Sequence, residues 1–204
     1  MQTHMTTKPR HVTGEKPATV ARSDRNSGRI RSIAFWAITF VIVFELAAGS
    51  VWNLLTIEWV EIQLHHLGYP HFFAYILGAW QAAAAVAIGV PRFPVVKEWA
   101  YAGAFFLWSG AVLSHWLAGD GPAAWGPPLM LAVCAIASWV LRPADRRLPP
   151  TRLARDHPAP QTRARSWAVA IGLLVVLYAI SFLTLPAVEH TMHEFAVELG
   201  WIAE

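Results

Sequence analysis

The chain has 204 residues, of which 55% are hydrophobic and only 14% are charged, and its formal net charge is +3. Soluble domains carry about 25% charged residues, so this composition, with a mean hydropathy of +0.39, excludes an ordinary soluble domain. The positive charge does not indicate nucleic-acid binding, because membrane topology accounts for the basic segments. With Cys134 as its single cysteine, the chain has no dithiol pair for redox chemistry.

Five apolar segments follow a polar, basic tail at residues 1–30, which we expect to be disordered and cytoplasmic. Each segment is near the roughly 20 residues that cross a bilayer. We place the five transmembrane helices at residues 32–55, 72–90, 98–118, 126–141 and 167–185. The fourth is the shortest, and we expect Pro127 and Pro128 in its first turn, where the missing N–H groups have no partner. A Pro- and Arg-rich cytoplasmic linker, residues 143–165, precedes the fifth.

The positions of Lys and Arg predict the orientation, because these residues are retained on the cytoplasmic side in short loops. All 16 lie before the first segment, between the second and third, or between the fourth and fifth. The remaining connections and the C-terminal tail carry acids and no bases. The sequence therefore predicts a multi-pass protein of the cell inner membrane, in contact with lipid, with a cytoplasmic N-terminus and an extracytoplasmic C-terminus.

Polar side chains within the apolar segments are candidates for function, because each is costly in hydrocarbon. Glu45 lies near the middle of the first segment and Gln81 at a similar depth in the second, so we expect a hydrogen bond between them with Glu45 neutral. Trp52 and Asn53 continue this polar stripe toward the outer end.

The third segment carries a second set of polar and aromatic residues, with Tyr101, Trp108 and His115 recurring every seven residues on one face. Glu45 at mid-depth, with His115 and Asp120 nearer the outer end, resembles a proton path or a polar head-group pocket. A polar interior that only fixes helix register is the structural alternative. The ligand-binding or proton-path candidates are Glu45, Trp52, Asn53, Trp80, Gln81, Trp108, Ser114, His115 and Asp120. No catalytic residue and no metal ligand is assigned, since the histidines of the outer segments are interpreted as polar surface.

Small residues predict where helices pack closely. Gly78, Ala82, Ala85 and Gly89 form one stripe in the second segment, and the third contains Gly103, Gly110 and Ser114. After residue 186, apolar residues recur at helical spacing between acids, so we expect an amphipathic helix on the outer surface.

Several short runs in the chain resemble the DoxX-like membrane proteins: ELAAG at 45–49, VWNL at 51–54, HLGYP at 66–70, LGAWQ at 77–81, PRFP at 91–94 and KEWAYAG at 97–103. The resemblance covers residues 31–142 and implies an all-α, four-helix membrane bundle there. Residues 166–204 add a fifth transmembrane helix and an acidic extracytoplasmic tail. Gln81 departs from the family pattern, which has a lysine after the tryptophan, and this weakens any transfer of a charged site.

The resemblance implies a link to thiosulfate oxidation that feeds a quinone pool, or to membrane complexes that handle oxidative stress. Our first hypothesis is a non-catalytic accessory or assembly subunit of a redox or respiratory membrane complex, docked to other membrane subunits through the fifth helix. The alternative is a protein that binds a quinone or another lipophilic ligand in an interior formed by Glu45, Trp80, Trp108 and His115. A small transporter is the second alternative. The sequence contains no cofactor motif, and a quinone is the one cofactor that the resemblance leaves open.

Overall fold

The computed structural model describes residues 18–143 and 164–202. Within these ranges the chain forms helices and turns without any strand. In chain order the helices are α1 (Ala18–Leu55), α2 (Glu58–His66), α3 (Phe73–Gly89), α4 (Pro94–Ala118), α5 (Pro122–Leu141), α6 (Ala164–Leu183) and α7 (Leu185–Glu198).

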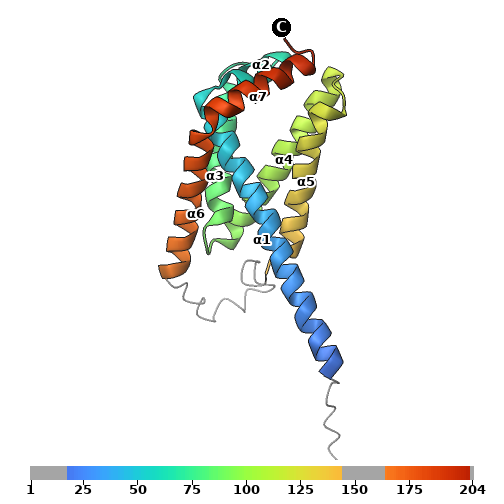
Figure 1. The fold of residues 1–204 in the computed structure, drawn as a ribbon, viewed down its shortest axis with the longest axis vertical. Helices are drawn as coiled ribbons and strands as arrows, with labels where there is room; N and C mark the ends of the chain where they lie inside the picture. Colours follow the sequence, from blue (N-terminus) through green and yellow to red (C-terminus); the bar gives the residue numbers. More distant parts are fainter. Residues whose placement is uncertain (1–17, 144–163, 203–204) are drawn as a thin grey trace, which may run out of the picture.

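Five long helices form the body of the protein (Figure 1). Helix α1 crosses the bundle and packs against α3, α5 and α6, while α4 packs against α3 and α5. Side chains from all five meet in one apolar core, which includes Leu46 of α1, Ile88 of α3, Trp108 of α4, Ala135 of α5 and Leu177 of α6. The four helices α1, α3, α4 and α5 thus make a bundle, and α6 is added along one side of it.

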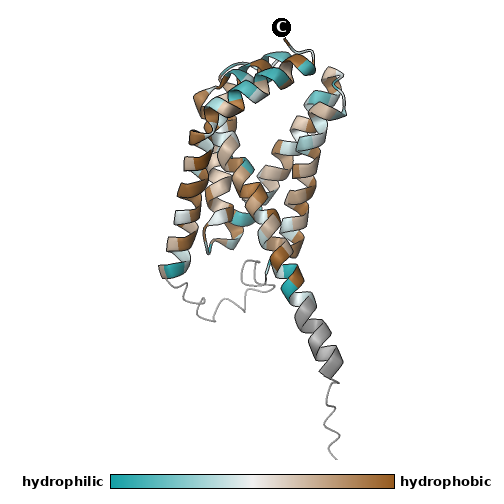
Figure 2. Ribbon diagram, viewed as in Figure 1, coloured by the Kyte–Doolittle hydropathy of each residue, from teal (hydrophilic) through white to brown (hydrophobic). Residues whose placement is uncertain are grey.

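The surface of the bundle is apolar, as a lipid environment requires (Figure 2). Residues 27–55 of α1, together with α5 and α6, are each long and apolar enough to cross a membrane. Helix α3 is shorter, with 17 residues, and lies in the bundle beside the 25-residue α4. Large apolar side chains such as Phe106, Leu117 and Leu183 are exposed on this surface. The predicted all-α, polytopic membrane fold with a fifth transmembrane helix is confirmed.

Two shorter helices, α2 and α7, lie across one end of the bundle and contact each other (Figure 1). Helix α2 buries Val60 and Leu64, and α7 buries Ala196, while the carboxylates of Glu58 and Glu194 remain exposed. Both are amphipathic, and the predicted amphipathic helix of the tail is therefore present as α7. We call this end of the bundle the α2–α7 end.

The helix boundaries correct two expectations. Residues 18–30, predicted to be disordered, form the start of α1, since the apolar helix that follows them can continue into this polar segment. Helix α5 begins at Pro122, directly after the extended Gly121, so Pro127 and Pro128 lie inside the helix and not in its first turn. Pro122, and not Pro127 or Pro128, occupies the first turn of this helix, where a missing N–H group has no partner to lose. Residues 1–17 and 144–163, which include most of the predicted linker, lie outside the described residues.

The small-residue stripe of α3 packs as predicted. A Cβ atom on Gly78 would lie 2.7 Å from Cγ of Leu54 in α1, and one on Gly89 would lie 3.4 Å from a methyl carbon of Leu174 in α6. The expected packing face of α4 is wrong, because nothing lies within 4 Å of a Cβ placed on Gly103 or Gly110. Helix α4 turns its other face to the bundle, burying Ala104 and Trp108.

Candidate functional site

The polar residues shared by α1 and α3 form a small hydrogen-bonded group. The side-chain amide of Asn53 donates to the carbonyl of Gly49 at 2.8 Å and to Oε1 of Gln81 at 3.1 Å. A Cβ atom on Gly49 would lie 2.7 Å from Nε2 of Gln81, so only glycine leaves room for this amide. These contacts join α1 to α3.

Glu45 does not take part in this group. It is half-buried in α1, and no side chain in residues 18–143 or 164–202 forms a hydrogen bond or ion pair with its carboxyl. The expected Glu45–Gln81 hydrogen bond is therefore wrong, because Gln81 lies over Gly49 and reaches Asn53 instead. The buried base Lys97 is also engaged elsewhere, since its ammonium donates to the carbonyls of Ala87, Ile88 and Val90 at the C-terminal end of α3.

The three candidate tryptophans lie in different environments. Trp108 is buried in the core, whereas Trp80 is 71% exposed on the lipid side of α3. Trp52 packs on a second apolar cluster beneath α2 and α7, and its indole Nε1 has no hydrogen-bond partner among the described residues. Trp80 directly precedes Gln81 in α3 and so lies about 100° around the helix from it, on the lipid side. The four residues Glu45, Trp80, Trp108 and His115 therefore do not line one interior pocket.

Asp120 organises a polar cluster at the α2–α7 end. One of its carboxylate oxygens lies 2.7 Å from Nδ1 of His115, and the other lies 2.9 Å from Nε2 of His66. The indole of Trp201, in the C-terminal tail, donates to Asp120 at 3.3 Å. On its other side the buried His115 places Nε2 at 3.2 Å from the amide nitrogen of Gln63. Ser114 is separate from this cluster and bonds to Tyr69.

Trp201 is enclosed by aromatic rings as well as by this carboxylate. The centroid of its indole ring lies 4.7 Å from the ring centroid of His66, 5.2 Å from that of Trp59 and 5.4 Å from that of His115. All three pairs are stacked. Burial of Asp120 acts to raise its pKa, but hydrogen bonds from His115, His66 and Trp201 outweigh this effect and hold the pKa below its usual value. Asp120 bonds to His66 of α2, to His115 of α4 and to Trp201 of the tail. The cluster therefore connects the tail to both helices.

This cluster does not have the geometry of a metal site. Within the part of the chain that the structure describes, no three His, Cys, Asp or Glu side chains are arranged to hold an ion. Both carboxylate oxygens of Asp120 already accept hydrogen bonds. The side chains of His66, His115 and Asp120 all contact Trp201 of the C-terminal tail.

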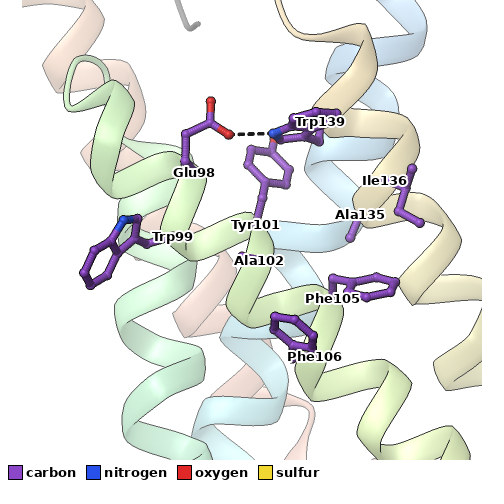
Figure 3. Close-up of a pocket in the computed structure, with 9 residues that line it drawn as sticks. All are labelled: Glu98, Trp99, Tyr101, Ala102, Phe105, Phe106, Ala135, Ile136 and Trp139. Carbon is purple, nitrogen blue, oxygen red and sulfur yellow. Dashed lines mark hydrogen bonds between the residues drawn. The ribbon is translucent and has the colours of Figure 1, made fainter. Parts of the chain in front are cut away.

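A groove of about 660 Å³ opens between α4 and α5, near the end of the bundle opposite α2 and α7 (Figure 3). Most of its wall is apolar or aromatic, and its polar groups lie together at one end. It is lined by Glu98, Trp99, Tyr101, Ala102, Phe105, Phe106, Ala135, Ile136 and Trp139. Phe106 is 69% exposed, so the groove faces the lipid region directly.

An ion pair forms the polar end of this groove. Arg142 donates to one oxygen of Glu98 at 2.7 Å. The indole of Trp139 donates to the other oxygen at 2.6 Å, as Figure 3 shows. The guanidinium of Arg142 lies 5.1 Å from the ring centroid of Tyr101 and is 3% exposed. Glu98 is therefore fixed by α5 while remaining partly accessible from the groove.

Behind Tyr101, a chain of hydroxyl groups connects α4, α5 and α1. The phenol oxygen of Tyr101 lies 2.8 Å from Oγ of Ser138, and Ser138 lies 2.7 Å from Oγ1 of Thr39. The Thr39 hydroxyl donates to the backbone carbonyl of Phe35 at 2.6 Å. This chain was not anticipated, because each member is a common residue and the pairing joins positions far apart in the sequence.

A second groove, of about 360 Å³, lies between α3 and α4. Trp99 lines both grooves, and Trp80 and Gln81 line the second. Two of the predicted candidates, which are neighbours on α3, thus line this groove. The α4–α5 groove involves none of the nine candidates, although Tyr101 had been recognised as one of three residues recurring along α4.

Comparison with known proteins supports the family and nothing narrower. The model of the DoxX-like family matches residues 37–138, which are 102 of the 204 residues of the chain. Searches of curated proteins and of solved structures returned no match. The matched range begins within α1 and ends within α5, so it contains most of the four-helix bundle and the lining of the α4–α5 groove up to Ile136, while Trp139 and Arg142 lie just beyond it. The chain is a membrane protein that belongs to the DoxX-like family.

Proposed function

We propose that this protein binds a lipophilic small molecule, such as a quinone or its reduced hydroquinone form, in the α4–α5 groove. The observation that carries the proposal is the groove itself, with a volume of about 660 Å³ and a single polar end. Small-molecule sites usually measure about 300–1,000 Å³ and combine mostly apolar walls with a few polar groups that orient the ligand. The α4–α5 groove has both properties.

The aromatic side chains support a ring-shaped or unsaturated ligand. Phe105 and Phe106 stand on α4 and Trp139 on α5, so a flat ring between the two helices has aromatic faces on either side (Figure 3). The Glu98–Arg142 ion pair holds the polar end in place before any ligand arrives. A preorganised site of this kind loses little conformational freedom on binding.

The groove also has a suitable position for a ligand that is dissolved in the membrane. The basic residues around the first, third and fifth helices favour a cytoplasmic location for the end of the bundle that carries Glu98 and Arg142. In that orientation, a lipophilic molecule enters sideways from the inner half of the membrane, with its polar group near the interface. The protein is then multi-pass in the inner membrane, with the α2–α7 end outside.

Identification of what copurifies with the full chain tests this proposal. The protein is purified in mild detergent, and bound small molecules are extracted and identified by mass spectrometry. Ala102 lines the groove and is exposed, so Ala102→Trp fills it without disturbing the core. Ala83→Trp is the matched control, because Ala83 is an exposed alanine in the second groove. A ligand lost only with Ala102→Trp supports the proposal, and a ligand retained by both variants contradicts it.

A second candidate function is that of an accessory subunit in a larger membrane complex. The observation that favours it is the exposure of α6, which packs on the bundle along one side and leaves Val169, Val176 and Leu183 exposed. Partner helices in membranes pack against such faces. If a copurifying protein chain is present in stoichiometric amount and is lost on deletion of residues 166–204, the accessory function is favoured over ligand binding.

A further inference from the structure

We propose that the α4–α5 groove selects amphiphiles whose head group donates a hydrogen bond, such as phenols, hydroquinones and alcohols, over those whose head group only accepts. This inference rests on the proposed function, since it names the chemical class of ligand for the same groove. It follows from the positions of the protons at the polar end of the groove.

The hydroxyl chain behind Tyr101 has a fixed direction. A hydroxyl group has one proton to donate. The Thr39 proton is directed to the carbonyl of Phe35, which can only accept, so the bond between Thr39 and Ser138 must use the proton of Ser138. The bond between Ser138 and Tyr101 must then use the proton of Tyr101. The hydroxyl of Tyr101 therefore has no proton left to donate at the polar end of the groove.

The ion pair at the same end also offers acceptors. Both oxygens of the Glu98 carboxylate accept one bond, from Arg142 or from Trp139, and each oxygen retains a lone pair. The Glu98 side chain is 25% exposed, so a ligand can reach it. A carboxylate accepts a hydroxyl proton in a charge-assisted hydrogen bond, which is stronger than a bond between neutral groups.

The neighbouring donors are engaged or directed elsewhere. The single N–H of the Trp139 indole is used by Glu98. Arg142 lies beneath the rings of Tyr101 and Trp139 and is 3% exposed, so its guanidinium is not a surface of the groove. Trp99 has an indole N–H, but its ring extends away from Glu98 and Trp139 (Figure 3). A head group that only accepts hydrogen bonds thus lies against other acceptors.

The test compares two ligands that differ in one proton. The probes are 4-nonylphenol and its methyl ether, which share the ring and the alkyl chain, and binding to the full chain in lipid nanodiscs is measured by tryptophan fluorescence. One hydrogen bond to a charged group changes affinity by about ten- to a hundredfold, so we expect the phenol to bind at least about tenfold more tightly than the ether. Ala102→Trp should abolish saturable binding of both, and Ala83→Trp should leave both unchanged.

A second variant tests the direction of the hydroxyl chain. Ser138→Ala removes the acceptor of the Tyr101 proton, so Tyr101 becomes able to donate to the ether oxygen. We expect the preference for the phenol to fall by about threefold or more in this variant, a change that loss of packing would not produce. Tyr101→Phe deletes the hydroxyl and should also reduce the preference, through weaker binding of the phenol.

The outcomes separate the inference from the function on which it rests. If neither probe shows saturable binding that Ala102→Trp removes, the proposed function fails. If both probes bind in the groove with equal affinity, the proposed function stands and selection for a donor is overturned. A preference that is unchanged in Ser138→Ala and in Tyr101→Phe overturns the assignment of selectivity to the hydroxyl chain.

Discussion

Replacement of Trp201 by alanine should release the C-terminal tail from the bundle without unfolding it. Trp201 is the point at which this tail meets α2 and the loop after α4, through ring contacts and a hydrogen bond to Asp120. Among the described residues, the backbone N–H of Trp201 donates to the carbonyl of Ala196, near the end of α7. Loss of the indole therefore weakens docking of the tail, although α7 still contacts α2 through Phe195 on Trp59, and leaves the core of the bundle intact.

The size of the effect follows from the three ring contacts. Their centroid distances, 4.7, 5.2 and 5.4 Å, lie within the range in which ring pairs attract each other. At about 0.5–1.5 kcal/mol each, they contribute about 1.5–4.5 kcal/mol to docking of the tail. The indole hydrogen bond, at 3.3 Å, is longer than usual and adds little. The open tail should become about 10- to 2,000-fold more populated.

A cysteine that is buried only when α7 is docked measures this opening. Ala196 of α7 is fully buried, so Ala196→Cys in a Cys134→Ala chain should react with a membrane-impermeant maleimide only when the tail lifts. Trp201→Ala should raise the labelling rate in proportion to the open population. Trp116→Ala is the matched control, because Trp116 is 68% exposed near the same end of the bundle. Equal labelling rates in the two variants would refute the role assigned to Trp201.

Three further predictions concern charge. The pKa of Asp120 is lowered in the folded protein, so docking of the tail should hold at neutral pH. It should weaken only as the pH falls below about 3.9, the ordinary pKa of Asp. Weakening between about pH 7 and 5 in the labelling assay would contradict this. Glu45→Gln should leave the melting temperature nearly unchanged, since no described side chain bonds to Glu45, and a variant that cannot be recovered folded would disprove this. Reporter fusions after Arg165 should be cytoplasmic and those after Glu204 extracytoplasmic; a cytoplasmic C-terminus would show that α6 does not span.

The features that depend on composition could be predicted from the sequence. The apolar segments predicted the ends of the five long helices within a few residues, because the length of a span is set by membrane thickness; the exception is the start of α1, which extends back to Ala18. The stripe from Gly78 to Gly89 gave a real packing face, since small residues are needed wherever backbones approach. Polar partners could not be derived in this way. Glu45 and Gln81 share a depth, but the choice of Asn53 as the partner of Gln81 depends on how α1 is rotated against α3.

The α4–α5 groove was missed for a similar reason. Sequence reasoning favoured polar residues deep within the spans, where each carries a high cost, and so selected Glu45 and His115. The groove is built instead from aromatic residues, which membrane interfaces contain in any case, and from a Glu98–Arg142 pair at the edge of the bundle. The groove is recognised by the close approach of two charged residues that are 44 positions apart in the chain, and this approach is visible only in the folded structure.

The hydroxyl chain shows how a residue outside the groove can determine its chemistry. Thr39 belongs to α1 and does not line the groove, yet its bond to the carbonyl of Phe35 sets the direction of the two hydroxyl bonds that follow. Exchange of Thr39 for valine would keep a branched side chain of similar size and remove the proton that fixes this direction. Ser138 would then be free to donate its proton to Tyr101, and Tyr101 would regain the ability to donate its own proton to a ligand. The selectivity of a lipid-facing groove on α4 and α5 thus depends on the hydrogen bonding of a third helix, which neither the lining residues nor the sequence motifs reveal.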